Sequence, residues 1–185
     1  MGADPGKHGA IVLINVADPS DQIHIPTKVK DGRIDTLYWY NSILPYKDNI
    51  VVAVKEEIHA IFGSSAASTF EFGASDGMLE AFLQLLSNNK FEVYKVQPKN
   101  WQACAWKKVD KINGDPIIDK ETGLQKVNKD GEPRFKTDTK ATSASAAHKL
   151  FPNVSFVPKR CRNEHDGVID AALIAYYGIC KYARK

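Results

Sequence analysis

The sequence contains few cysteines, and none has the spacing of a metal site. Cys104, Cys161 and Cys180 are the three cysteines among 185 residues, and they lie far apart along the chain. An odd number without a close pair predicts reduced thiols and a reducing compartment, not a disulfide framework.

Long hydrophobic runs are also missing. No stretch approaches the roughly 18 apolar residues that a membrane span requires. The first residues lack the basic segment and long apolar stretch of a secretory signal. We therefore expect a cytoplasmic protein without membrane contact. The apolar fraction of 43% is ordinary, and the length is enough for one domain with its own core.

There is no strong excess of one charge, because the formal net charge is only +3. The distribution is more informative than the total. Basic residues gather between Lys99 and Lys140, and a second group comprises Lys159, Arg160 and Arg162. Such groups can meet phosphates, but they can equally form a solvated face, and charge alone does not decide between the two.

The hydrophobic pattern alternates between strands and helices. We expect Asp4 to end or follow a very short first strand, and residues 154–157 to form a short strand or an extended linker. Longer strands are predicted at 10–16, 22–29, 50–57 and 91–96, and helices at 33–44, 75–88, 99–107, 137–151 and 164–183. We expect Ser75 to cap the second helix and Thr137 or Asp138 to cap the fourth. This order predicts an α/β domain with a mixed five-stranded sheet flanked by helices.

Residues 108–136 differ in character from the rest of the chain. They contain the turn signals "NGDP" and "KDGEP", many charges and few large apolar side chains. We interpret the segment as a basic insertion that forms either a β-hairpin or a mobile loop.

Four acids lie at the ends of predicted strands or on one face of the last predicted helix. Asp4 ends the first strand, and Glu56 stands at the end of an apolar strand on the same face as Val52 and Val54. Asp166 and Asp170 are four residues apart and share one face of the last helix. Taken singly, Asp4 suits a turn, Glu56 a solvated strand end and Asp166 a helix cap.

Taken together, the four acids favour a metal site. Carboxylates on one helix face repel each other, and burial near an apolar strand end increases the cost. A hard divalent cation such as Mg²⁺, or Mn²⁺, reverses this because it prefers oxygen ligands. Two such ions about 3.5–4 Å apart can activate a water and stabilise the leaving 3′ oxygen in phosphodiester hydrolysis.

Three segments resemble the RuvC-type Holliday junction resolvases of the RNase H-like, or retroviral-integrase, superfamily. "GADPG" resembles the family's first acidic strand, "VAVKEEIHA" its second, and "HDGVIDAALIA" its C-terminal acidic helix. "ASTFEFGASDGMLEAFLQLL" and "VQPKNW" resemble the phage and prophage branch. The resemblance covers most of the chain except 108–136. It implies an RNase H-like fold in a single nuclease domain over 1–185, in a bacterial or infected host cell.

By this resemblance the catalytic residues and metal ligands are Asp4, Glu56, Asp166 and Asp170, holding two Mg²⁺ ions per active site, with Mn²⁺ as the other option. The chain departs from the family pattern at three points. The last two acids are four apart instead of three, and Gly167 occupies the three-apart position. Lys55 stands where an apolar residue is expected, and Ala3 replaces the usual Ile.

The resemblance implies DNA contacts beside the acids. Phe62 is either a base-stacking residue or part of the core, and Trp101 and Trp106 are expected in the core. His59 and His165 have no assigned role. The expected DNA-binding residues are Lys7, His8, Phe62, Lys107, Lys108, Lys136 and Lys140.

The leading hypothesis is a crossover junction endodeoxyribonuclease, acting in DNA recombination and repair, that cuts four-way junctions by paired phosphodiester hydrolysis. A less selective RNase H-like nuclease acting on branched DNA, flaps or DNA–RNA hybrids is the first alternative. A non-catalytic nucleic-acid-binding module of the same fold is the second. Since a four-way junction is nearly two-fold symmetric, we expect a homodimer, with 75–88 and the neighbouring loop at its interface.

Overall fold

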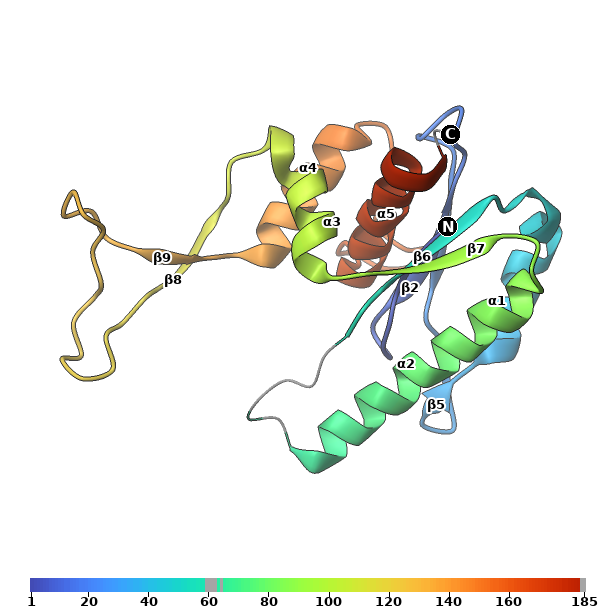
Figure 1. Ribbon diagram of the computed structural model, residues 1–185, viewed down its shortest axis with the longest axis horizontal. Coiled ribbons are helices and arrows are strands. Elements are labelled where there is room, and N and C mark those ends of the chain that lie inside the picture. Colours follow the sequence, from blue (N-terminus) through green and yellow to red (C-terminus); the bar gives the residue numbers. More distant parts are fainter. Residues whose placement is uncertain (59–62, 64, 184–185) are drawn as a thin grey trace.

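A five-stranded mixed sheet forms the centre of the computed structural model, which describes residues 1–58, 63 and 65–183 (Figure 1). The strand order is β3-β2-β1-β6-β7, and β2 runs antiparallel to the other four. The strands are β1 (Gly2–Asp4), β2 (Ala10–Ile14), β3 (Gln22–Pro26), β6 (Val52–Glu56) and β7 (Glu92–Val96). This order and these directions are those of the RNase H-like fold, which confirms the predicted fold class.

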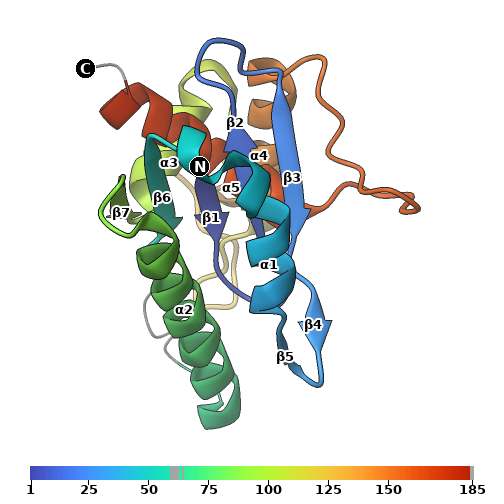
Figure 2. The same cartoon turned by 90° about the vertical axis from the view of Figure 1, so that its right-hand side faces the viewer.

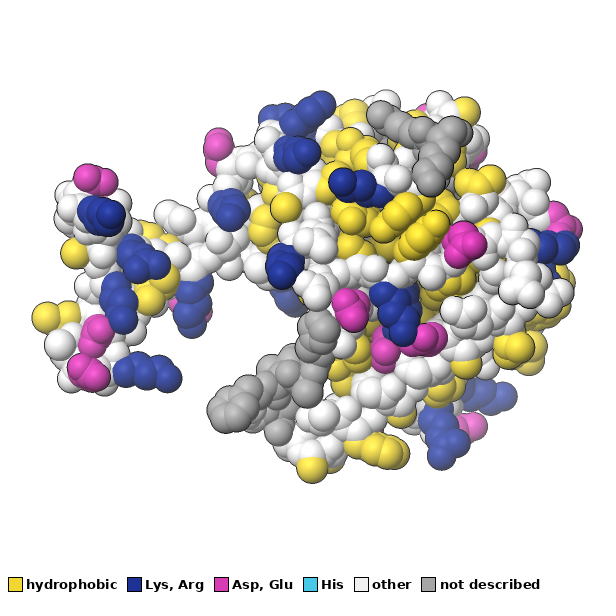
Figure 3. Space-filling model, viewed as in Figure 1, with side chains coloured by type: hydrophobic (Ala, Val, Ile, Leu, Met, Phe, Trp, Pro, Cys, Tyr) yellow, Lys and Arg dark blue, Asp and Glu magenta, His cyan; other side chains and the backbone are white. Residues whose placement is uncertain are grey.

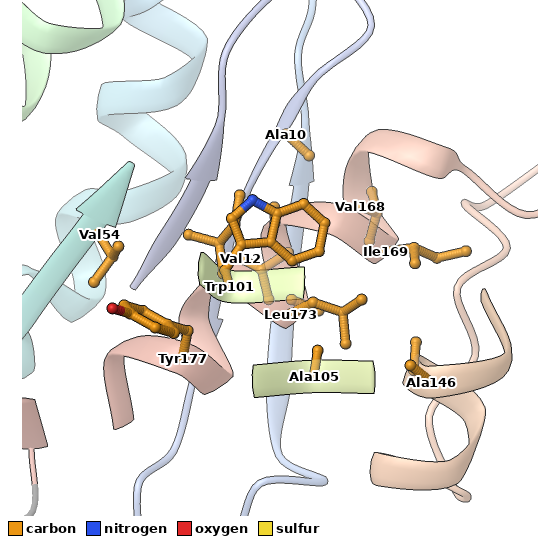
Figure 4. Packing of buried hydrophobic residues seen from close by; sticks show 14 of the residues in the cluster. Ala10, Val12, Val54, Trp101, Ala105, Ala146, Val168, Ile169, Leu173 and Tyr177 are labelled. Carbon is orange, nitrogen blue, oxygen red and sulfur yellow. The ribbon is translucent and has the colours of Figure 1, made fainter. Parts of the chain in front are cut away.

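Helices cover both faces of this sheet (Figure 2). One face packs against α3 (Pro98–Ala105), α4 (Thr139–Leu150) and α5 (Asp166–Gly178), and the other packs against α1 (Thr36–Ile43) and α2 (Ala66–Ser87). The period of two in β6 explains the division, because Val52 and Val54 enter the first core and Ala53 the second. Figure 4 shows the first core, where the Trp101 indole of α3 packs near Leu173 of α5.

Several predicted boundaries differ from those observed. The helix expected at 75–88 begins nine residues earlier, at Ala66, because the Ser65 hydroxyl caps it by accepting the Ser68 N–H. It ends at Ser87, followed by Asn88 in the left-handed conformation. Ser75 is therefore a buried residue inside the helix, and the prediction that it caps the helix was wrong.

Other elements are shorter than predicted. The segment 33–44 divides into β5 (Arg33–Ile34), helix α1 capped by Asp35, and the first residue of a 3₁₀ helix (Leu44–Asn49). β5 pairs with β4 (Val29–Lys30), so the strand predicted at 22–29 also divides in two. Asp138 caps α4, as one of the two predictions had it. The last helix ends at Gly178 and continues as a π-helical turn, Ile179–Ala183.

The segment 108–136 forms an extended arm that projects from the body (Figure 1). Its base is an antiparallel ladder between β8 (Asn113–Pro116) and β9 (Phe135–Thr137), which fits the hairpin alternative. The segment contains seven Lys and Arg residues against six Asp and Glu residues. Its charge is thus nearly balanced, and Figure 3 shows both signs on the arm.

Candidate active site

Asp4 and Glu56 lie side by side at the carboxyl ends of two parallel central strands. β1 pairs with β6 through Gly2↔Val54 and Ala3↔Lys55, so the next residues along each strand are Asp4 and Glu56. By the period of two, both acids share the face of Gly2 and Val54. That face is the one covered by α5.

Close backbone contacts bring α5 against this end of the sheet. A Cβ on Gly2 would lie 2.2 Å from the Ala171 carbonyl oxygen, and one on Gly167 would lie 2.2 Å from the His8 carbonyl oxygen. Glycine at position 2 allows the middle of α5 to lie against β1, and glycine at position 167 allows the first turn of α5 to lie against the turn that joins β1 to β2. Gly167, which cannot ligate a metal, therefore has a packing role that places Asp170 near Asp4.

Asp4, Glu56 and Asp170 form an electrostatically coupled group. Burial, followed by the charges of Asp170 and Glu56, raises the pKa of Asp4 well above its usual value. Burial and the Asp170 charge raise the pKa of Glu56 to about 7. Burial also raises the pKa of Asp170 to about 6, an effect that a hydrogen bond from Ser143 partly opposes. The three carboxylates are thus held close together, and the Lys140 charge offsets only part of the rise at Asp170.

Asp166 is in a different environment. Its carboxylate accepts a hydrogen bond from the Lys140 ammonium at 2.6 Å, and its side chain is 55% exposed. The Asp166 carboxylate raises the pKa of Lys140. His165, not Asp166, caps α5, because its Nδ1 accepts the Val168 N–H. This observation rules out the cap interpretation of Asp166 and gives His165 a structural role.

The placed side chains do not form a ready-made metal site. Within the part of the chain that the structure describes, no group of three or more His, Cys, Asp or Glu residues has a geometry that could hold a metal ion. The structure therefore brings three of the four predicted acids together and keeps the fourth paired with a cation.

The predicted DNA-contacting residues have different surroundings. Lys7 pairs with Glu71 of α2 at 3.1 Å, and His8 is exposed. Lys107, Lys108 and Lys136 are exposed near the base of the arm. Phe62 and His59 lie outside the described residues. Trp101 is 1% exposed and Trp106 is partly buried, which confirms the prediction that both belong to the core.

Three side chains near the acids were not identified from the sequence. Ser143 of α4 hydrogen-bonds to Asp170, and the Trp101 side chain lowers the pKa of Glu56 in opposition to burial. Lys55, beside Glu56, is 1% exposed and pairs with Asp76 and Glu80 of α2. Of these three, only Lys55 is unusual in the sequence itself, because it is a lysine within an apolar strand.

Comparisons with known proteins find no matching protein-family model and no matching curated sequence. Among solved structures, the chain is similar to the RuvC structure of Thermus thermophilus, with a TM-score of 0.45 and 12% identity over 96% of this chain and 92% of that one. A likeness this distant does not define a function, and the fold assignment above depends on strand order and direction. None of the helices among the described residues has the length and hydrophobicity needed to cross a membrane.

Proposed function

We propose that this chain is a divalent-metal-dependent DNA endonuclease that cleaves four-way junctions. The observation that carries the proposal is the convergence of Asp4, Glu56 and Asp170 at one end of the central sheet, with the pKa of each raised. A structural role does not account for three adjacent carboxylates in a partly buried position, because their repulsion and desolvation destabilise the fold. Perturbed carboxylates of this kind are typical of functional sites.

The donor set fits Mg²⁺ or Mn²⁺. Asp4, Glu56 and Asp170 offer oxygen ligands, which hard cations prefer, and a cation nearby lowers the pKa values that burial has raised. When bound, such ions supply Lewis-acid stabilisation and an activated water for phosphodiester hydrolysis. In this proposal Asp4, Glu56, Asp166 and Asp170 would hold two such ions, and Lys140, which pairs with Asp166 in the metal-free protein, would contact a phosphate of the substrate.

The chain's own residues orient this site. Gly2 and Gly167 keep α5 tight against β1, so Asp170 faces Asp4 across a fixed distance. Ser143 holds the Asp170 carboxylate, and Trp101 contacts Glu56 from α3. His8, Lys107, Lys108, Lys136 and Lys140 are exposed, and we propose that they contact DNA phosphates.

The proposed substrate is branched DNA, and the proposed assembly is a homodimer through α2. The outward face of this 22-residue helix exposes Phe70 and Leu85, whose relative exposures are 76% and 80%. An isologous pair of such helices gives two active sites related by a two-fold axis, as symmetric cutting of a junction requires. We therefore propose an interface that covers the predicted residues 75–88 and also the earlier part of α2, which includes Phe70.

One experiment tests this function. The purified chain is incubated with a synthetic four-way junction, a fork, a linear duplex and a DNA–RNA hybrid, in Mg²⁺, in Mn²⁺ and in EDTA. We expect metal-dependent paired cuts in the junction, which Asp4→Asn abolishes and Asp115→Asn, an exposed change in the arm, leaves intact. Equal cutting of duplex or hybrid would instead establish the less selective nuclease. Binding without any cleavage in either metal would establish the non-catalytic module.

A further inference from the structure

A cavity of about 620 Å³ lies beside the edge strand β3, outside the acid cluster. Its lining includes Gln22 and His24 from β3, and Phe156 and Lys159 from the segment that joins α4 to α5. Lys28 and Tyr38 lie across from them. In Figure 2 this edge of the sheet is free of a further strand. None of the residues that line the cavity is acidic, so its two lysines favour an anionic ligand.

The cavity also has a flat aromatic ring in its wall, that of the partly buried His24, whereas Phe156 behind it is 1% exposed. The His24 ring stacks on Phe156 with centroids 5.5 Å apart and an interplanar angle of 9°. Burial lowers the pKa of His24, so its ring is neutral at pH 7. The Lys28 ammonium sits 3.9 Å from the centre of the Tyr38 ring, and this cation–π contact holds it at the cavity. A planar ring beside fixed cations is the composition of a nucleotide-binding surface.

Backbone groups of β3 face the same space. The Thr27 N–H bonds to the Gly9 carbonyl and the Asn15 N–H to the Asp21 carbonyl, so the odd-numbered residues of this segment turn their backbone groups toward β2. In an antiparallel pair the alternate residues turn theirs away. The N–H and C=O groups of Gln22 and His24 therefore point outward from the sheet edge, where they can hydrogen-bond to the edge of a base.

The position of the cavity connects it to the acid cluster. Pro26, at one end, pairs with Ala10 in the register that follows the Asp4 turn. Val168, which also lines the cavity, lies in the first turn of α5 between Asp166 and Asp170. The exposed residues Arg160 and Arg162 extend the positive surface past Lys159. The cavity and the acid cluster are thus both bordered by the start of α5.

We propose that this cavity binds one unpaired nucleotide of the nucleic-acid substrate, with its phosphate between Lys28 and Lys159 and its base against the His24 ring, which the buried Phe156 ring supports. This inference depends on the proposed function for its ligand class, but it concerns binding alone and not hydrolysis. It gives a role to the basic group at 159–162, which the acid cluster does not use. It also makes edge strand β3 a second contact surface for the substrate.

Fluorescence anisotropy tests the proposal with a labelled single strand and a labelled four-way junction, titrated in EDTA over a range of salt concentrations. We expect the double variant Lys28→Gln/Lys159→Gln to bind the junction about tenfold more weakly than the unmodified chain. The slope of log affinity against log salt should fall by about 0.7, because the contact to one phosphate of an unpaired nucleotide is lost. The matched control is Lys30→Gln/Lys47→Gln, which changes two lysines outside the cavity lining. Its affinity and its salt slope should stay closer to those of the unmodified chain than those of the cavity variant do.

A second readout locates the contact directly. Ultraviolet crosslinking of a 4-thiothymidine-containing strand should label peptides that contain residues 22–28 or 156–159. Unchanged affinity and slope in the cavity variant, or equal losses in the control, would overturn the inference while leaving the cleavage assay unaffected. Failure of the unmodified chain to bind any nucleic acid would overturn the proposed function as well, so the two failures are distinguishable.

Discussion

The Lys140 ammonium lies 2.6 Å from the Asp166 carboxylate, whereas Asp170, one helical turn further along α5, has no such cation at hydrogen-bond distance among the described residues. Two acids on one helix face therefore differ in electrostatic state. Asp166 is neutralised at the surface, and Asp170 is partly buried beside Asp4 and Glu56. This difference allows the two acids to be separated experimentally in the metal-free protein.

Asp170→Asn should stabilise the metal-free protein at pH 8, by about 1–3 kcal/mol, because it removes a charge whose pKa burial raises to about 6. Asp166→Asn, on the same helix, should change stability by less than about 1 kcal/mol, since it breaks an exposed ion pair. Urea denaturation in EDTA measures both. Equal effects of the two substitutions would show that Asp170 is not held in a charged cluster.

Stability of the metal-free protein should fall as pH rises from about 4.5 to 7. Glu56 has a folded-state pKa of about 7 against a usual value of 4.5, so over this interval the unfolded chain has released a proton that the folded chain still binds. The unfolded state is therefore favoured, and the contribution of Glu56 lowers the free energy of unfolding by up to about 3 kcal/mol before it levels off. The raised pKa values of Asp4 and Asp170 add to this loss, whereas the buried Met1 amine, whose pKa falls to about 5, opposes it above pH 5. The low pKa of Asp119, about 2, also acts with the opposite sign but below this interval.

Thermal unfolding in EDTA at several pH values checks this expectation, with Glu56→Gln as the comparison. The variant should show a much flatter profile between pH 5 and 7 and should gain less stability when Mg²⁺ is added. A profile identical to that of the unmodified chain would mean that Glu56 ionises normally.

The sequence predicted the fold and most of the acid cluster because both depend on local patterns. The apolar run before Glu56 and the four-residue spacing of Asp166 and Asp170 are visible without tertiary information. The Lys140–Asp166 pair was not predictable, because it joins residues 26 apart that only the packing of α4 on α5 brings together. The start of α2 was missed since the small residues after Ser65 have weak hydrophobic periodicity.

Gly167→Ala should destabilise the protein by about 2–3 kcal/mol or more, because its Cβ would lie 2.2 Å from the backbone oxygen of His8. Backbone cannot move aside as a side chain can. Gly77→Ala is the matched control, since nothing lies within 4 Å of a Cβ there and alanine favours the helix by up to about 1 kcal/mol. Guanidinium denaturation compares the two. A tolerated Gly167→Ala would contradict the close contact between α5 and the β1–β2 turn.

Leu85→Glu should convert the proposed dimer to a monomer without unfolding it. The Leu85 side chain is 80% exposed in the isolated chain, so a carboxylate there is hydrated in the monomer but desolvated in an apolar interface. Sedimentation equilibrium measures the mass, and circular dichroism checks the fold. The control is Leu124→Glu, a 70% exposed leucine in the arm, which should leave the mass unchanged. A monomeric unmodified chain at micromolar concentration would contradict the proposed assembly.

Asp76→Ala should cost more stability than Lys55→Met, although both break the same ion pair. The Lys55 side chain is 1% exposed, and removal of Asp76 leaves its charge buried with Glu80 at 3.5 Å as the remaining partner. Such a loss is worth about 3 kcal/mol. Methionine fills a similar volume without a charge, and the Asp76 side chain, 20% exposed, can regain water. The double variant should therefore resemble Lys55→Met alone in urea denaturation.

The exposed pair of Lys90 and Asp48, 2.7 Å apart, provides the control, and Asp48→Ala should cost less than about 1 kcal/mol. A double-mutant cycle without coupling would show that this buried pair does not fasten α2 to the strand that carries Glu56.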